Sequence, residues 1–438
     1  MQLPKLSELD LEESTEGSSE ALGLDAIAEE LAHQLIPGIR ERHQHPRFLT
    51  SIAVSLYLCS HFQDWEVASD QLSEPWQVFE WHYVEGLVRH SEDRSDVTGL
   101  PGVGKVRQAN QDRLPLNARR YLKSAANNGF HGIYRGLARD LQIEEANLLA
   151  PIGEKLLTCW ENEQQLEGFF GGDSGPGLAR RTQLLDALRS ALDQGQVERK
   201  ANWQGWTFFH DHLHFRHPGI EESKVILKAL REDTEGFRRE ILDAIKKPEA
   251  KQIWKSTRTR WQFEALLHQL LAAKGSPAIQ PLLQAIESYE SFSLLLHNAF
   301  HACIEHLAQQ SLPSSTLQLA KLDHVSHAAR SIHDAFQRCV DHLGAVSLSS
   351  RFIASFSHFA DVLPPNDWLH ILFEHHRSVQ DRKLPIPRAH WIDQLPGGTW
   401  LIRSAYRESA QIIGAGIYLH PYRAQSLRRF AEDLHWVT

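Results

Sequence analysis

Apolar residues recur at helical spacing along most of the chain, and this periodicity limits the fold more than any other feature. Leucine, isoleucine and alanine repeat at intervals of three and four over residues 24–36. Residues 79–88 show the same pattern, and the Glu74-Pro75 pair before them is typical of a helix start. An apolar stripe at this spacing buries one face of an α-helix. The sequence therefore predicts a mainly α, multi-helical protein.

The C-terminal half is expected to hold two long helices and little β structure. Helical periodicity covers residues 277–309 and 315–343, with a proline-containing break between them. Strand signals are scarce along the whole sequence. The best of them, residues 399–402, follows the Pro-Gly-Gly turn at 396–398. We therefore expect at most a small β-hairpin near the C-terminus.

A chain of 438 residues is long enough for two or three domains. The clearest linker is the glycine-rich stretch 171–177, and a further break falls near Gly344. Residues 91–115 are polar and contain glycine and proline, so they are expected to form a long loop. The predicted division is an acidic disordered tail over 1–20, an N-terminal helical domain over 21–170, a central helical domain over 178–344 and a C-terminal basic helical region over 345–438.

From this sequence we expect neither a transmembrane helix nor a signal peptide. No stretch approaches the roughly 18 apolar residues of a transmembrane helix. The first residues lack the basic start and apolar run of a signal peptide. The four cysteines form no C-x-x-C pair, which favours a reducing, cytoplasmic setting over a disulfide framework.

Charge is distributed unevenly along the chain, whose formal net charge is −9. Residues 1–34 carry nine acids against one lysine; such a segment is usually a solvated tail, although it can also screen a basic site. Three windows are basic: 105–139 has eight basic residues against one acid, 246–260 six against one, and 377–429 nine against three. An anionic partner relieves the repulsion within such a window. The alternative is neutralisation by neighbouring acidic helices.

A glycine-rich motif opens the first basic window. Residues 99–105 match the first seven positions of a phosphate-binding loop, G-x-x-x-x-G-K, but Val106 stands where that loop needs serine or threonine for Mg²⁺. The stretch Leu100-Pro-Gly-Val-Gly104, with Ala109 after it, resembles the turn of the helix-hairpin-helix family. The resemblance implies backbone amides that contact a DNA phosphate without reading sequence. The polar residues after Ala109 depart from that family's apolar second helix.

Residues 116–141 are expected to form a helix, a tight turn and a second helix. The spacing of Ala125 and Gly129 resembles that of the DNA-binding helix-turn-helix, and Arg135 and Arg139 lie one turn apart on the polar face of the second helix. The alternative is an ordinary helical hairpin with a solvated face. The candidate nucleic-acid contacts are Lys105, Arg107, Arg119, Arg120, Lys123, Arg135, Arg139, Arg403, Arg407 and Arg423.

Histidine is abundant, at 26 residues. One cluster spans 210–217, where either a strand or a helix would align three imidazoles, so the spacing does not define a zinc site. A second set, His297, His301 and Glu305, is followed by histidines and aspartates over 323–334, but the Glu-x-x-His pattern of di-iron bundles does not occur there. We expect neutral histidines packed between helices, and neither a metal nor another cofactor.

The candidate catalytic residues lie near the C-terminus. Glu374, His375 and His376 follow an apolar helix, and His420 comes further along the chain. A glutamate and a histidine brought together can perform general acid–base catalysis, and a cluster of arginines can clamp a phosphate. The alternative is the charged rim of a helical domain. The order of helix, Glu-His, Trp and Arg-Tyr-Arg resembles the ends of helical accessory proteins from bacterial phage-defence operons.

These features favour a helical subunit or adaptor that contacts nucleic acid within a multi-component bacterial system, and the resemblance implies anti-phage defence. The expected partners are a nucleic acid, most simply DNA, and other protein subunits, with no membrane. Two alternatives stay open. One is a hydrolase with a Glu/His or His-metal site, and the other is a helical scaffold whose basic patches bind an acidic protein.

Overall fold

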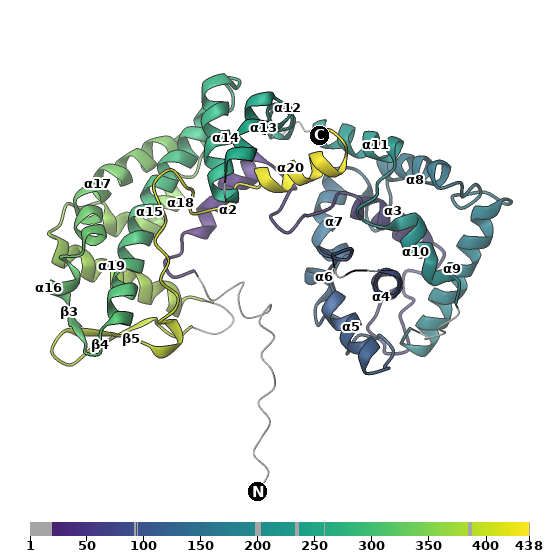
Figure 1. Ribbon diagram of the computed structural model, residues 1–438, viewed down its shortest axis with the longest axis horizontal. Coiled ribbons are helices and arrows are strands. Elements are labelled where there is room, and N and C mark those ends of the chain that lie inside the picture. The colour runs from purple at the N-terminus through teal and green to yellow at the C-terminus, as the bar shows by residue number, and fades with distance from the viewer. Residues whose placement is uncertain are drawn as a thin grey trace, which may run out of the picture. The chain divides into compact units, whose positions relative to one another are not determined.

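Two compact units make up the described part of the chain. The computed structural model describes residues 20–91, 93, 95–197, 203–232, 236–257, 259–383 and 388–437. Unit 1 contains residues 20–35 and 248–422, and unit 2 contains residues 36–247 and 423–437. Each unit thus combines two separate stretches of sequence. In Figure 1 the purple helix α2 (Asp25–Leu35) belongs with the green helices, and the yellow helix α20 (Ala424–Asp433) belongs with the blue ones.

Both units are mainly α-helical, as predicted. The other helices of unit 2 are α3 (Phe48–Cys59), α4 (Pro75–His90), α5 (Val103–Gln111), α6 (Ala125–Asn128), α7 (Phe130–Asp140), α8 (Pro151–Glu163), α9 (Pro176–Gln194), α10 (Gly205–Leu213), α11 (Ile220–Arg231) and α12 (Arg238–Ile245). Those of unit 1 are α13 (Pro248–Ser256), α14 (Arg260–Lys274), α15 (Gln280–Gln309), α16 (Thr316–Leu319), α17 (Asp323–Gly344), α18 (Ser349–Phe356), η1 (Ser357–Phe359), α19 (Pro365–Asp381) and η2 (Ser404–Tyr406). Within these ranges, no helix has both the length and the apolarity needed to cross a bilayer.

Several helices lie where the sequence predicts them. Helix α4 begins at Pro75, and the backbone N–H of the preceding Glu74 donates to the side chain of Gln77 at 2.8 Å, as in a capping box. Helices α15 and α17 correspond to the predicted 277–309 and 315–343. The second of them starts later than expected, because the residues before it form a short strand and the single turn α16.

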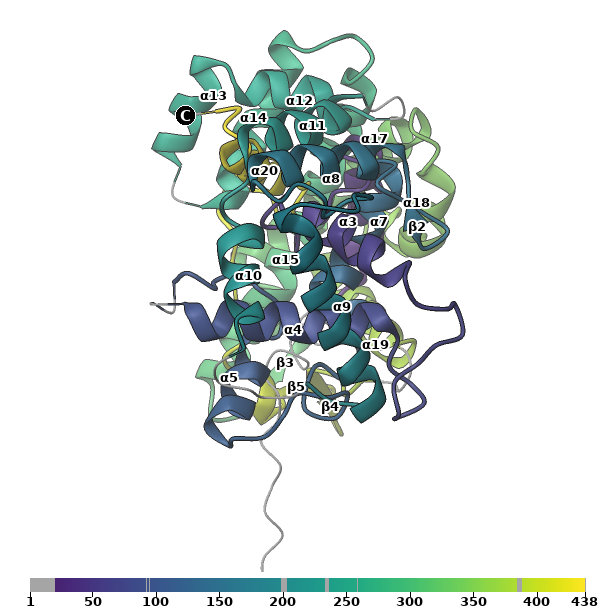
Figure 2. The same ribbon diagram turned by 90° about the vertical axis from the view of Figure 1, so that its right-hand side faces the viewer.

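The core of unit 2 is built around α3, whose residues are buried on almost every side. Neighbours of α3 include α4, α7, α8 and α9. Phe48 stacks on Phe215 with ring centroids 5.1 Å apart and on Phe130 at 5.3 Å. Helix α4 runs across α9 and α10, which complete this side of the core (Figure 2). Burial of large aromatic rings provides most of the hydrophobic stabilisation in such a core.

The core of unit 1 is centred on α15 and α17, which pack side by side (Figure 1). Phe292 of α15 meets Phe352 and Phe356 of α18 edge to face, with centroids 4.9 and 5.4 Å apart. Helix α2 also packs on α15, where the hydroxyl of Tyr289 donates to the carbonyl of Leu24 at 2.5 Å. The stretch from residue 20 to 35 is therefore an integral part of this unit.

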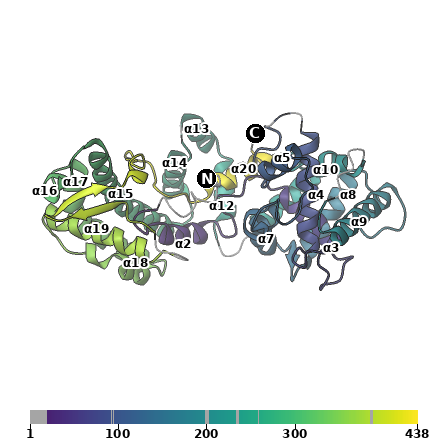
Figure 3. The same cartoon turned by 90° about the horizontal axis from the view of Figure 1, so that it is seen from below.

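The predicted C-terminal hairpin is confirmed. Strands β4 (Ile392–Leu395) and β5 (Thr399–Ile402) pair antiparallel across a turn in which Gly397 and Gly398 both have positive φ. The structure adds β3 (Ser314–Ser315) to β5, and this small sheet lies against α15 (Figure 3). A second, two-residue hairpin pairs β1 (Glu144–Glu145) with β2 (Leu148–Leu149) in unit 2.

Two local predictions in the first basic window are wrong. The expected loop over 91–115 contains the helix α5, and the expected first helix of the helix-turn-helix is replaced by turns before the single turn α6. The side chain of Asn117 accepts from the backbone N–H groups of Arg119 and Arg120, both at 3.1 Å, and holds this segment in a turn. Gly129 has φ −76° and directly precedes α7.

The contacts divide the chain differently from the predicted domains. The glycine-rich stretch 171–177 joins α8 to α9 inside unit 2, and the Arg181 side chain donates to the carbonyls of Phe169 and Gly172 across it. Gly344 ends α17 without separating it from α18, which packs on it in unit 1. Most of the predicted acidic tail, residues 1–19, lies outside the described residues. The backbone carbonyl of Glu20 already accepts a hydrogen bond from Gln380.

Candidate functional site

Both ring nitrogens of His376 form hydrogen bonds within the core of unit 1. Its Nδ1 donates to the backbone carbonyl of Ala21 at 2.9 Å, and its Nε2 accepts from the backbone N–H of Trp391 at 3.0 Å. The side chain is completely buried, and burial lowers the pKa of His376 to about 4. A neutral imidazole with both nitrogens occupied has a structural role, so this predicted catalytic residue has no position left for a substrate.

His420 lies in a separate buried cluster. Its Nδ1 is 2.6 Å from the Glu290 carboxylate, which also accepts from the hydroxyl of Tyr422 at 2.7 Å. Its Nε2 faces the carboxylate of Asp25 at 3.7 Å. Burial lowers the pKa of His420, but Glu290 raises it, and the net shift is upward. The cluster ties the segment before residue 423 to α15 and α2.

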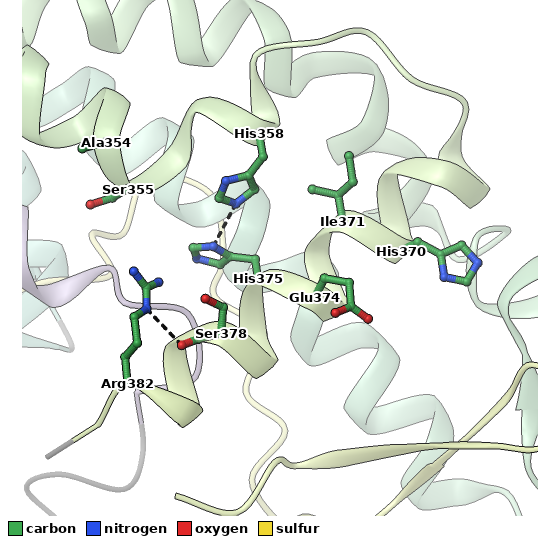
Figure 4. Close-up of a pocket in the computed structure, with 9 residues that line it drawn as sticks. All are labelled: Ala354, Ser355, His358, His370, Ile371, Glu374, His375, Ser378 and Arg382. Carbon is green, nitrogen blue, oxygen red and sulfur yellow. Dashed lines mark hydrogen bonds between the residues drawn. The ribbon is translucent and has the colours of Figure 1, made fainter. Parts of the chain in front are cut away.

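Glu374 and His375 line one pocket, which His376 and His420 do not line. The four predicted catalytic residues therefore do not form one acid–base site. The pocket lies where α18, η1 and α19 meet and has a volume of about 460 Å³ (Figure 4). Its walls are formed by Ala354, Ser355, His358, His370, Ile371, Glu374, His375, Ser378 and Arg382.

Two histidines form a hydrogen-bonded pair at the centre of the pocket. His358 Nε2 is 2.9 Å from His375 Nδ1, and His375 Nε2 is 2.7 Å from the backbone carbonyl of Leu22. Because a carbonyl only accepts, His375 must carry its proton on Nε2, and its Nδ1 then accepts from His358. This assignment leaves Nδ1 of His358 as the open acceptor of the chain.

Burial keeps the pair neutral. It lowers the pKa of His375 to about 4. It also lowers the pKa of His358, and the positive charge of Arg382 lowers that pKa further. The carbonyl–imidazole–imidazole chain fixes the ring orientation and tautomer of His358, as a carbonyl does for a metal-bound histidine. The pocket can therefore hold a hydrogen-bond donor at His358 and an acceptor at Arg382.

The predicted stripe on α7 is not an open basic surface. Arg135 and Arg139 both contact the buried carboxylate of Glu144, at 3.0 and 3.1 Å. His131, one turn before Arg135, is buried against Trp76 with ring centroids 4.7 Å apart. This arrangement is close to the alternative given for the basic windows, neutralisation by neighbouring acids, although Glu144 lies on the strand β1 and not on a helix.

A second group of cations around α5 lacks such acids. Arg107 lies on α5 and Arg113 directly after it, and Arg119 and Arg120 follow in the turn that Asn117 caps. We call these four residues the arginine surface. None of them forms an ion pair with another described residue. Arg113 and Arg119 are exposed, whereas Arg107 and Arg120 are partly exposed. Lys105 and Lys123, also predicted contacts, are exposed on the same stretch but have interactions of their own.

The three C-terminal arginines differ in their surroundings. The guanidinium of Arg403 makes a bidentate pair with Asp393, with N–O distances of 2.8 and 2.7 Å. Arg407 is exposed beside it, whereas Arg423 is buried and belongs to unit 2. Arg403 therefore already has the partner that a phosphate would need to replace.

The glycine motif before α5 forms a turn at which the helix begins. Gly102 has φ +82° and precedes the first residue of α5, and turns rather than a strand come before it. The ring of Tyr121 packs on Gly102 so closely that an added Cβ would lie 2.4 Å from it. A phosphate-binding loop of the nucleotide-hydrolase type needs a preceding buried strand, and the described residues there do not provide one.

The other histidine clusters serve packing. His297 and His301 stack with centroids 4.1 Å apart, and they bond the backbone oxygen and nitrogen of Gln411 at 2.8 and 3.1 Å. At 210–217, His214 is buried against Phe215. Among the described residues, no group of three histidine, cysteine, aspartate or glutamate side chains is arranged to hold a metal ion.

Sequence reasoning missed His358 and Arg382 as site residues. His358 lies 17 residues before its partner His375 and on a different helix, so no helical period connects them. A usable signal was the helix start at Pro364-Pro365, because it implies a helical hairpin that brings α18 against α19.

Compared with protein-family models, curated proteins and solved structures, the chain shows no significant match.

Proposed function

We propose that the protein contacts the phosphate backbone of a nucleic acid, most simply DNA, through the arginine surface of unit 2. The observation that carries this proposal is that none of these four guanidinium groups pairs with a described acid, whereas several other arginines of the same unit do. Arg47 pairs with buried Glu222 at 3.0 Å, Arg89 with Glu85 at 2.8 Å, and Arg231 with Asp243 at 2.8 Å.

The single acid within this stretch does not neutralise it. Asp112 accepts two hydrogen bonds from the Gln108 side chain, at 3.1 and 3.0 Å, instead of one from an arginine. Like charges without counter-charges raise the local potential and favour a polyanion. Contacts of this kind position a nucleic acid without reading its sequence, so we expect similar affinity for unrelated sequences.

A buried framework supports the surface. The hydroxyl of Tyr121 donates to the fully buried Glu80 of α4 at 2.8 Å, and its ring packs on Gly102 at the start of α5. The turn that bears Arg119 and Arg120 is therefore attached both to α4 and to α5. Arginines on such an attached turn lose less conformational freedom on binding than arginines on a mobile tail.

The test is the salt dependence of DNA binding by the full chain. Each cation removed from a phosphate contact should flatten the slope of log K against log[salt] by roughly 0.9 for duplex DNA. Arg113→Ala combined with Arg119→Ala should therefore flatten it by roughly 1.8 and weaken binding to unrelated duplexes about equally. Fluorescence anisotropy over a range of salt concentrations measures both quantities.

A matched control removes a single positive charge from another exposed helix of unit 2. Lys228 on α11 is 65% exposed and pairs only weakly with Glu232 at 3.5 Å, so Lys228→Ala should leave the slope unchanged. Circular dichroism verifies that each variant is folded. Equal slopes for the wild type and the folded double variant would contradict the proposal, and an absence of DNA binding by the wild type would favour the acidic-protein scaffold.

We place this contact in the setting that the C-terminal resemblance implies, a subunit or adaptor of a multi-component bacterial anti-phage system. Only that resemblance supports the setting. The hydrolase alternative has less geometric support, since two of its four residues, His376 and His420, are bonded inside the core.

A further inference from the structure

The pocket of unit 1 offers unused donors for an anionic group. Arg382 donates its Nε–H to the carbonyl of Ser378 one turn earlier, at 3.0 Å. Its two terminal nitrogens have no acceptor among the described residues, and no described acid pairs with it. The hydroxyl groups of Ser355 and Ser378 line the same pocket. A guanidinium with a free fork is the side chain best suited to bind two oxygens of one anion.

The histidine pair gives this end of the pocket a defined chemistry. His358 is positioned by its hydrogen bond to His375, which the carbonyl of Leu22 fixes in turn. Figure 4 shows Arg382 and both imidazoles in the same pocket, where one ligand can contact all three groups. Neutral His358 can accept a hydrogen bond at Nδ1 from the hydroxyl of a singly protonated phosphate group.

The opposite end of the pocket has the opposite sign. Figure 4 shows the imidazole of His375 between the guanidinium of Arg382 and the carboxylate of Glu374. Glu374 pairs with Arg377 at 2.9 Å but remains 64% exposed, so its second oxygen can still accept a hydrogen bond. A ligand spanning the pocket would therefore carry an anionic group at one end and hydroxyl or amino groups at the other.

We propose that the pocket between α18, η1 and α19 binds a small phosphate monoester, with the phosphate at Arg382 and His358 and a hydroxyl-bearing group toward Glu374. The volume of about 460 Å³ lies in the usual range for small-molecule sites, roughly 300–1,000 Å³. It fits a phosphorylated sugar better than inorganic phosphate alone. The site lies in unit 1 and is independent of the nucleic-acid contact proposed for unit 2.

Ribose 5-phosphate is the probe, with ribose and inorganic phosphate as comparison ligands. Calorimetric titration of the full chain should show binding of ribose 5-phosphate, weaker binding of phosphate and none of ribose. Arg382→Gln should weaken ribose 5-phosphate about 10- to 100-fold, the usual loss for a charge-assisted hydrogen bond. Arg351→Gln should leave the affinity unchanged, because Arg351 lies on α18 outside the pocket and is 53% exposed.

A spectroscopic measurement places the ligand. In protein labelled with ¹⁵N-histidine, the imidazole signal missing from His358→Gln identifies His358. That signal should move on addition of ribose 5-phosphate in the wild type, and in Arg382→Gln it should move only at about 10- to 100-fold higher concentrations. No binding at about 10 mM ligand, an equal loss in Arg351→Gln, or a static His358 signal would each overturn the proposal. DNA binding by the variants of the arginine surface is unaffected by any of these outcomes.

Discussion

Glu80 shows how a single buried carboxylate organises its surroundings. It accepts hydrogen bonds from the hydroxyl of Tyr121 and from the backbone N–H of His131, at 2.8 and 3.1 Å, while its own side chain is excluded from solvent. Burial raises the pKa of Glu80 to about 7, although both hydrogen bonds act in the other direction. The residue attaches the turn before α6 and the start of α7 to α4. Periodicity could not reveal it, because a buried acid on an apolar face breaks the pattern.

The raised pKa of Glu80 makes stability depend on pH. An acid whose pKa is higher in the folded state favours folding while it is protonated, and it loses that contribution as pH rises from its unfolded value toward about 7. Between pH 5 and 8 the wild type should lose roughly 2–3 kcal/mol relative to Glu80→Gln. Urea unfolding across this range measures the difference, and parallel stability curves would rule out a titrating Glu80.

His268 is a second buried polar residue, with a simpler expectation. It is 3% exposed between Tyr418 and Tyr422, neither ring nitrogen has a hydrogen-bond partner among the described residues, and burial lowers its pKa to about 3. Each unsatisfied buried group costs on the order of 1 kcal/mol or more. His268→Phe keeps the ring and removes these groups, so we expect an unchanged or higher melting temperature. A clear loss of stability would show that His268 has a polar partner.

Among the elements, the long amphipathic helices and the β4–β5 hairpin were predictable, whereas the region around α5 was not. The helices α15 and α17 are long and bury apolar residues at helical spacing, so their period is visible in the sequence. Helix α5 buries only Val106 and Ala109, too few to give a period. The expected first helix of the pair does not form, because the Asn117 side chain accepts hydrogen bonds from the backbone of the following turn. Tyr121 also bonds Glu80, which lies 41 residues away in the sequence.

Two glycines at the start of α5 provide a matched pair of variants. Gly102 has φ +82°, and an added Cβ would collide with Tyr121, whereas an added Cβ on Gly104 meets nothing within 4 Å. Gly102→Ala should destabilise unit 2 by at least about 1 kcal/mol. Gly104→Ala should be neutral or stabilise it by up to about 1 kcal/mol, because alanine restricts the unfolded chain and favours a helix. Thermal unfolding compares the two variants, and equal effects would contradict the observed turn at Gly102.

In the molecule as a whole, the abundance of histidine reflects its packing. His43, His82, His375 and His376 are buried, and burial lowers the pKa of each to about 4. The sequence could predict neutral packed histidines as a class. It could not show that His375 would meet His358 in a pocket, because that meeting depends on how α18 turns into α19 and on where residues 20–22 pack.

These buried histidines should make the protein sensitive to acid. A histidine with a lowered folded pKa contributes fully above pH 6.5 and loses that contribution as pH falls toward 4, because the unfolded chain takes up protons that the folded chain excludes. At pH 5.5 each such histidine lowers the free energy of unfolding by roughly 1.4 kcal/mol. The raised pKa values of Glu20, Asp25 and Glu80 offset part of this loss. We expect a marked fall in melting temperature between pH 7.5 and 5.5, and a flat profile would contradict it.

The interleaving of the two units bears on how the chain is made. In unit 1, α2 emerges from the ribosome long before α15, whose Tyr289 bonds the residue before α2. In unit 2, the stretch 36–247 emerges long before α20, whose Phe430 stacks on Tyr134. Each unit is complete only when its second stretch has been translated. The surface that α20 covers, on α12 and around His43 and Tyr134, therefore stays exposed until α20 is translated, and this interval is when a growing chain most needs a chaperone.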